Sequence, residues 1–223
     1  MSLFRYWGAL MVRQFAAGML AVLFLGIGNG FAEDTAAPDD VRVGDRWSYD
    51  VKDDATGDLR RTVTFVVIEI TDKEITTRVT ERGKDQPHTV VFNREWGRID
   101  NGIWQTRPSG YAIKKPLEVN KEWRNEASAR NLKTGVSLRV SAAAKVAAQE
   151  KITTVAGEFD TFRIEAKVRQ VNTKDQTKSS TISETTWYAP TINRWVKRKT
   201  ETRAEGRIRD SVSEELTEYT RKP

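Results

Sequence analysis

The sequence predicts an all-β protein, built as a curved antiparallel meander or half-barrel. Apolar and polar residues alternate in short runs, as they do in strands with one buried face and one wet face. Turn-forming residues separate these runs, as is typical of antiparallel sheets. The chain has no cysteine, so a hydrophobic core must stabilise it without a disulfide framework. In the clearest strand one face carries Phe162, Ile164, Ala166 and Val168.

Residues 1–32 have the pattern of a cleavable secretory signal peptide. Arg5 and Arg13 precede an apolar run at residues 15–27, which ends close to the small residue Ala32. The run is shorter than the roughly 20 apolar residues that a spanning helix needs, so we expect no membrane span after signal removal. No cysteine follows it to carry a lipid. The sequence therefore predicts a mature chain that starts at Glu33 and is periplasmic or secreted.

A flexible leader is expected at residues 33–40 and a single β-domain at residues 41–220. Alternation in the first part of this domain predicts strands at residues 43–51, 59–71, 75–82 and 88–96. Residues 97–116 are less regular, because Pro108 and Gly110 interrupt them. We expect only two short extended pieces there, at residues 99–104 and 111–113.

Residues 136–154 are open to two interpretations. Their central run is rich in alanine, which favours a helix. The flanking segments alternate with strand period, however, and this favours one long strand with small side chains on a crowded face. We adopt the strand and expect further strands at residues 162–169, 185–190, 193–198 and 206–219.

Two short similarities suggest that the domain consists of related halves, at residues 41–115 and 116–220. Residues 119–123, Val-Asn-Lys-Glu-Trp, resemble residues 43–47, Val-Gly-Asp-Arg-Trp. Residues 96–99, Trp-Gly-Arg-Ile, resemble residues 192–195, Ile-Asn-Arg-Trp. Both pairs occur in the same order, as an internal duplication predicts. The matches are short, so chance similarity is the alternative.

Motifs in the last third resemble those of a group of uncharacterised bacterial periplasmic β-proteins. The motifs are Val-Ala-Gly-Glu-Phe-Asp-Thr-Phe-Arg-Ile at residues 155–164 and Trp-Tyr-Ala-Pro at residues 187–190, followed by Arg194. The segment 116–123 adds to the resemblance. More distantly, the chain is similar to the curved half-barrel sheets of periplasmic lipoprotein carriers. The resemblance implies fold and compartment, and it brings no catalytic residues.

The sequence indicates no catalytic, cofactor-binding or metal site. His88 is the only histidine, so a histidine triad or a multi-histidine metal site would depend on it alone. Two carboxylate pairs, Glu158 with Asp160 and Asp53 with Asp54, lie in tight turns, where Asp bonds to local backbone. No nucleophile elbow, phosphate-binding loop or dinucleotide fingerprint is present. The net charge of +6 is spread over alternating strand positions, so we expect no nucleic-acid partner.

The seven tryptophans are the feature most open to a functional interpretation. Tryptophan at strand ends usually closes a small β-core. Alternatively, some could line an apolar groove; the candidates are Trp96, Trp104, Trp123, Trp187 and Trp195. We therefore predict a non-enzymatic soluble periplasmic protein, acting as a binding or envelope-maintenance module. The alternative is a carrier of lipid or another hydrophobic ligand, and a periplasmic hydrolase ranks third. Expected partners are an apolar ligand or an envelope protein.

Overall fold

The computed structural model describes residues 40–221, so the predicted signal peptide and nearly all of the predicted leader lie outside the described residues. Twelve strands and one short 3-10 helix make up this part of the chain. The strands are β1 (Arg46–Asp53), β2 (Leu59–Ile70), β3 (Glu74–Glu81), β4 (His88–Asn93), β5 (Arg98–Asp100), β6 (Trp104–Arg107), β7 (Glu122–Asn131), β8 (Ser137–Thr154), β9 (Gly157–Asn172), β10 (Ser179–Ala189), β11 (Arg194–Ala204) and β12 (Arg207–Thr220). The 3-10 helix η1 (Pro190–Ile192) lies between β10 and β11.

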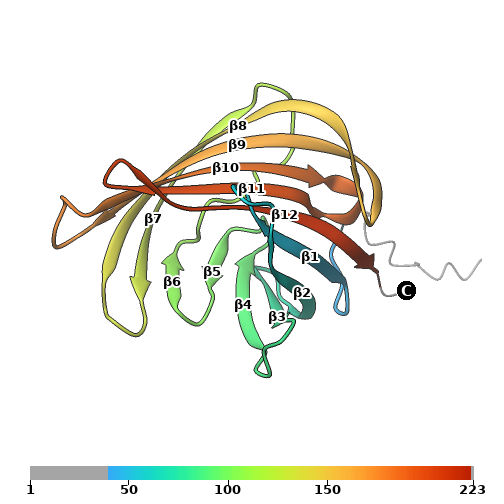
Figure 1. Cartoon of the computed structure of the whole chain (residues 1–223), viewed down its shortest axis with the longest axis horizontal. Helices are drawn as coiled ribbons and strands as arrows, with labels where there is room; N and C mark the ends of the chain where they lie inside the picture. Colours follow the sequence, from blue (N-terminus) through green and yellow to red (C-terminus); the bar gives the residue numbers. More distant parts are fainter. Residues whose placement is uncertain (1–39, 222–223) are drawn as a thin grey trace, which may run out of the picture. The chain divides into compact units, whose positions relative to one another are not determined.

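Each strand pairs antiparallel with the next, and β12 pairs with β1 to close a barrel (Figure 1). The closing pair is continuous, from Arg46 opposite Thr220 to Asp53 opposite Val212, with one register shift after Ser48. The antiparallel all-β meander predicted from the sequence is therefore confirmed. The sheet does not stop at a half-barrel, because the first and last strands satisfy each other's free edges.

The alanine-rich segment 136–154 is a strand, which confirms the interpretation adopted from its flanks. It forms β8, which pairs with β7 and β9. Its alternate residues Ala142, Ala144 and Val146 are buried, so one face of the strand points into the barrel. β7 (Glu122–Asn131) was not predicted as a strand, whereas residues 111–113, predicted as a short extended piece, form no strand. Residues 124–131 alternate exposed polar or charged residues with asparagine or alanine, and the lack of large apolar residues makes this a weak strand signal.

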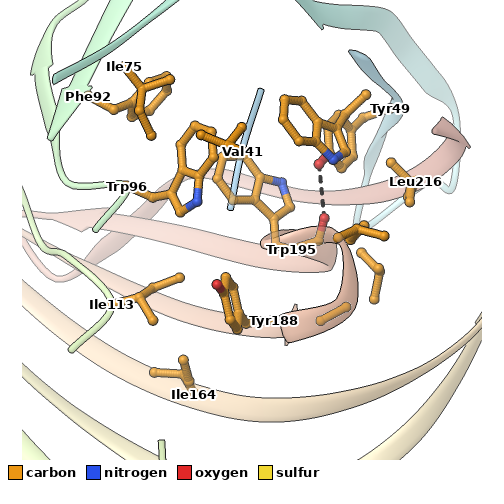
Figure 2. Close-up of a cluster of buried hydrophobic side chains, with 14 of the residues drawn as sticks. Val41, Tyr49, Ile75, Phe92, Trp96, Ile113, Ile164, Tyr188, Trp195 and Leu216 are labelled. Carbon is orange, nitrogen blue, oxygen red and sulfur yellow. Dashed lines mark hydrogen bonds between the residues drawn. The ribbon is translucent and has the colours of Figure 1, made fainter. Parts of the chain in front are cut away.

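A buried cluster of aromatic and aliphatic side chains fills part of the barrel interior (Figure 2). Trp47, Tyr49, Ile164 and Leu216 are each no more than 1% exposed, although they come from three different strands, β1, β9 and β12. The Tyr49 hydroxyl donates to the carbonyl oxygen of Trp195 at 2.9 Å and ties β1 to β11 across the interior. Because this bond is buried, it satisfies a polar group that would otherwise be costly inside the core.

The two turns at residues 43–47 and 119–123 have the same backbone structure. Gly44 and Asn120 both adopt positive φ angles, of 95° and 73°. The Gly44 amide donates to the Val67 carbonyl at 2.8 Å, and the Asn120 amide donates to the Val146 carbonyl at 2.8 Å. The amide of each valine donates back to the turn: Val67 to the Asp45 carbonyl and Val146 to the Lys121 carbonyl, both at 2.9 Å. The register then shifts directly after each valine, in β2 and in β8.

The second pair of similar segments also forms matching turns, but with an offset of one residue. Trp96 and Asn193 have positive φ angles, of 62° and 48°. Each amide donates back three residues, Trp96 to the Asn93 carbonyl at 3.1 Å and Asn193 to the Pro190 carbonyl at 2.9 Å. Trp96 therefore corresponds to Asn193, whereas the sequence similarity placed it opposite Ile192.

Candidate functional site

The barrel encloses a cavity of about 570 Å³. A barrel's diameter grows with its strand number, and roughly eight strands already leave room for one small ligand. Twelve strands enclose more space, and the wall formed by β7, β8 and β9 contributes only small or medium side chains, including Ala129, Val140 and Val168. The volume falls within the range of about 300–1,000 Å³ that is typical of small-molecule sites.

One wall of the cavity is aromatic and is held by a buried arginine. Phe65, Phe92, Trp96 and Trp195 line the cavity and surround the guanidinium of Arg194. That guanidinium lies 3.9 Å from the ring centroid of Trp96 and 3.8 Å from that of Trp195. Close contact with a ring face favours a cation electrostatically, and it keeps the two indoles apart. We call these five residues the arginine box.

Arg194 itself is completely buried at the start of β11. None of its three guanidinium nitrogens has a hydrogen-bond partner in the part of the chain that the structure describes. Burial lowers its pKa to about 10, because the charged form has lost its hydration. The box is therefore a cation held by ring faces and not by an ion pair.

The five tryptophans predicted as a groove are divided by the structure. Trp96, Trp104 and Trp195 line the cavity. Trp123 stacks on Tyr111, with ring centroids 6.3 Å apart, and donates to the Ala112 carbonyl at 3.0 Å. Trp187 donates to a Glu150 carboxylate oxygen at 2.6 Å, and the Lys197 ammonium lies 5.8 Å from its ring. Neither Trp123 nor Trp187 is among the cavity-lining residues.

Charged side chains form a second region of the cavity lining. Arg198 of β11 and Glu214 of β12 face each other and form an ion pair of 2.7 Å. The Arg198 guanidinium also stacks on Trp195, at 4.3 Å from the ring centroid. Arg98 and Glu184 line the same region from β5 and β10. We call these four side chains the charged cluster.

Arg98 is accessible to solvent, and yet burial lowers its pKa. The two observations agree because its accessible surface faces the cavity, where surrounding protein limits hydration. Tyr111 lies beside it, since the Gly110 amide donates to the Arg98 carbonyl at 2.7 Å. The Tyr111 hydroxyl is buried without a hydrogen-bond partner among residues 40–221. Burial, and then the Glu184 charge, raises the pKa of this tyrosine, so it remains a proton donor.

The residues considered for catalysis have different surroundings. His88 begins β4 and lines the cavity. Glu158 pairs with Lys151 on the exposed surface at 3.0 Å, and Asp53 pairs with Arg60 in the first hairpin. No group of three or more histidine, cysteine, aspartate or glutamate side chains between residues 40 and 221 is placed to hold a metal ion. Over the same residues, no helix is long and apolar enough to cross a membrane.

The charged cluster was not predicted, although part of the signal is visible in the sequence. Glu214 lies between Val212 and Leu216 at strand period, so it shares their inward face. Glu184 likewise alternates with Ile182 and Thr186. A charge on an apolar face indicates either a partner or a water-accessible interior. Arg98 had no such signal, because β5 is only three residues long.

No protein-family model and no curated protein matches the chain. Among solved structures, a predicted exported protein with a YmcC-like fold from Bacteroides fragilis superposes with a TM-score of 0.54 at 12% identity, covering 81% of this chain and 97% of that chain. A predicted lipoprotein from Parabacteroides distasonis gives a TM-score of 0.52 at 16% identity, covering 80% and 96%. The hypothetical lipoprotein YmcC from Escherichia coli gives 0.47 at 11% identity, covering 79% and 85%. The first two show a shared fold.

Proposed function

We propose that this protein is a non-enzymatic binding protein of the bacterial cell envelope that carries an amphiphilic small molecule inside its barrel. The observation that carries the proposal is the cavity, whose lining joins an aromatic wall to a charged cluster. Ligand sites typically combine a mostly apolar lining with a few placed polar groups. The proposal develops the carrier hypothesis from the sequence and adds a polar end to the ligand.

The arginine box supports binding because it fixes the aromatic wall before any ligand arrives. Trp96 is held by Arg194 and also donates from its indole nitrogen to the Asn193 side chain at 3.3 Å. Trp195 is fixed on its other face by Arg198. A wall that is already ordered costs less conformational entropy on binding than one that must rearrange.

The envelope location rests on separate support. Residues 1–32 have the sequence pattern of a signal peptide, and the motifs in the last third of the chain resemble those of periplasmic β-proteins. The Bacteroides protein of the same fold is described as exported, and the Parabacteroides protein is described as a lipoprotein. We propose the same compartment for this chain, reached by a cleavable signal peptide and without a lipid-bearing cysteine.

Dye binding with a matched pair of variants tests the proposal. Val168 lines the cavity, and its neighbour Lys167 points outward and is exposed. An apolar dye such as N-phenyl-naphthylamine should bind the folded protein saturably, and octyl amphiphiles should displace it. Val168→Phe should weaken dye binding by reducing the cavity, whereas Lys167→Phe should bind like the wild type. Dye binding only on unfolding, or equal binding by both variants, would contradict the proposal.

A further inference from the structure

Among the charged side chains that line the cavity, Arg98 and Glu184 have opposite signs and form no ion pair with any described residue; Arg61 also forms none. Arg98 makes no side-chain hydrogen bond or ion pair with any residue in the range 40–221. Glu184 accepts a hydrogen bond only from the Thr186 hydroxyl, at 2.9 Å, within the same range. Other cavity carboxylates are matched, since Glu214 has its arginine and Glu81 has Lys84 at 2.6 Å.

These two charges extend from nearly opposite walls. Around the closed barrel, four strands separate β5 from β10 in one direction and six in the other. Arg98 and Glu184 nevertheless interact electrostatically, since the Glu184 charge acts to raise the pKa of Arg98 against the larger effect of burial. Arg198, on the strand next to Glu184, also interacts with the Glu184 charge, but its ion pair is with Glu214. The lining therefore offers the Arg98 guanidinium from β5 and the Glu184 carboxylate from β10, neither of them in an ion pair among the described residues.

The buried Tyr111 hydroxyl adds a hydrogen-bond donor to the cavity lining. It has no hydrogen-bond partner in the described part of the chain, and the Gly110 amide, which donates to the Arg98 carbonyl, holds the backbone next to Tyr111 against that of Arg98. A guanidinium and a phenol hydroxyl both donate, so they suit carboxylate or phosphate oxygens. Glu184 only accepts and suits an ammonium group.

From this arrangement we infer that the cavity selects a zwitterionic headgroup, with its anionic part on Arg98 and Tyr111 and its ammonium on Glu184. The inference deepens the proposed function and rests on it. A purely anionic headgroup would be repelled by Glu184 and would leave that carboxylate unpaired. A purely cationic headgroup would be repelled by Arg98 and would leave that guanidinium unpaired. The apolar part of the ligand lies against the arginine box. Both an alkyl phosphoethanolamine and an α-amino fatty acid offer this chemistry.

The wild-type protein provides the first test, through amphiphiles with one tail and different heads. Affinities of octyl phosphoethanolamine, the matching α-amino fatty acid, octyl sulfate and octylammonium are measured by calorimetry below their micelle concentrations. At least one zwitterion should bind about ten-fold or more tightly than both singly charged compounds, the difference expected from one charge-assisted hydrogen bond. Tighter binding of octyl phosphoethanolamine would indicate a lipid headgroup as the ligand, and tighter binding of the α-amino fatty acid would indicate an amino-acid headgroup.

Charge-neutral variants provide the second test. Glu184→Gln should weaken zwitterion binding about ten-fold and strengthen octyl sulfate binding, while Arg98→Gln should strengthen octylammonium binding. The controls Glu126→Gln and Arg139→Gln make the same changes at exposed positions, and they should leave the affinities for the zwitterion, octyl sulfate and octylammonium unchanged. Equal wild-type affinity for sulfate and zwitterion would overturn the inference, even if a variant fails to fold. If the wild-type protein still binds the dye when the zwitterion shows no preference, the proposed carrier function stands and only the zwitterion inference fails. If the folded protein does not bind the dye either, both the proposed function and the inference fail.

Discussion

Replacing Arg194 tests whether ring faces alone can hold a buried cation. Its guanidinium lies between the rings of Trp96 and Trp195, and no carboxylate pairs with it among residues 40–221. Two substitutions separate charge from shape. Arg194→Met removes the charge and keeps a long apolar side chain, whereas Arg194→Lys keeps the charge and loses the flat guanidinium.

The expected magnitudes follow from two opposing effects. Burial lowers the pKa of Arg194 from 12.5 to about 10, which corresponds to about 3 kcal/mol of unfavourable free energy for the charged form. Two desolvated ring faces offset this by about 2 kcal/mol each. Because the sum is close to zero, Arg194→Met should change the free energy of unfolding by no more than about 1 kcal/mol. Arg194→Lys keeps the desolvation cost but stacks poorly, so it should lose about 2–4 kcal/mol.

Urea unfolding followed by tryptophan fluorescence and circular dichroism measures both variants. The methionine protein should unfold at a urea concentration near that of the wild type, and the lysine protein at a clearly lower one, with the same slope. The reverse order would refute the reasoning. It would mean that the positive charge, and not the planar contact with the indoles, stabilises the box.

The remaining predictions concern the core, the ion pair and pH. Ile164→Asp should unfold the barrel, since it loses about 1.5–3 kcal/mol of burial and adds a buried charge; a cooperative melt at the wild-type temperature would contradict this. Glu214→Gln should cost about 1–3 kcal/mol in urea unfolding, less than for a fully buried pair because both partners are partly exposed; an unchanged midpoint would show the pair to be unimportant. Burial raises the pKa of Tyr49 and Tyr111, so their contribution to stability should be lost as the pH rises above about 10, where phenols ionise first in the unfolded chain. The pH series is best run in Arg194→Met, because the lowered arginine pKa acts with the opposite sign in the same range; native phenolate absorbance that rises fully near pH 10 would disprove the burial effect.

Local patterning was sufficient to predict most of the strands. The run from Phe162 to Val168 has the inward face that its alternation indicates, and the alanine-rich β8 is extended, as its flanks predicted. Barrel closure was not predictable in the same way. It depends on β12 meeting β1 across more than 150 residues, and no periodicity within either strand carries that information.

The cavity was only partly predictable for the same reason. Tryptophans are conspicuous in composition, but alternation does not tell whether an inward indole meets a neighbour, as Trp123 meets Tyr111, or faces open space, as Trp104 does. Arg98 and Glu184 lie 86 positions apart on nearly opposite walls, and only the curvature of the whole sheet brings them to one cavity. Their relation is a property of the barrel and not of any local segment.

The matching turns at Gly44 and Asn120 bear on how the chain could be rewired. Six strands follow each turn, β1–β6 and β7–β12, and Arg46 lies opposite Thr220 where the barrel closes. A short linker from residue 221 to residue 41, with new ends at residues 115 and 116, would preserve every strand neighbour. The barrel should therefore tolerate circular permutation at that point, and two separate half-chains should be able to complement each other. This bears on the proposal that residues 41–115 and 116–220 are related halves. A half-length ancestor with six strands would have closed the same barrel as a dimer of two chains.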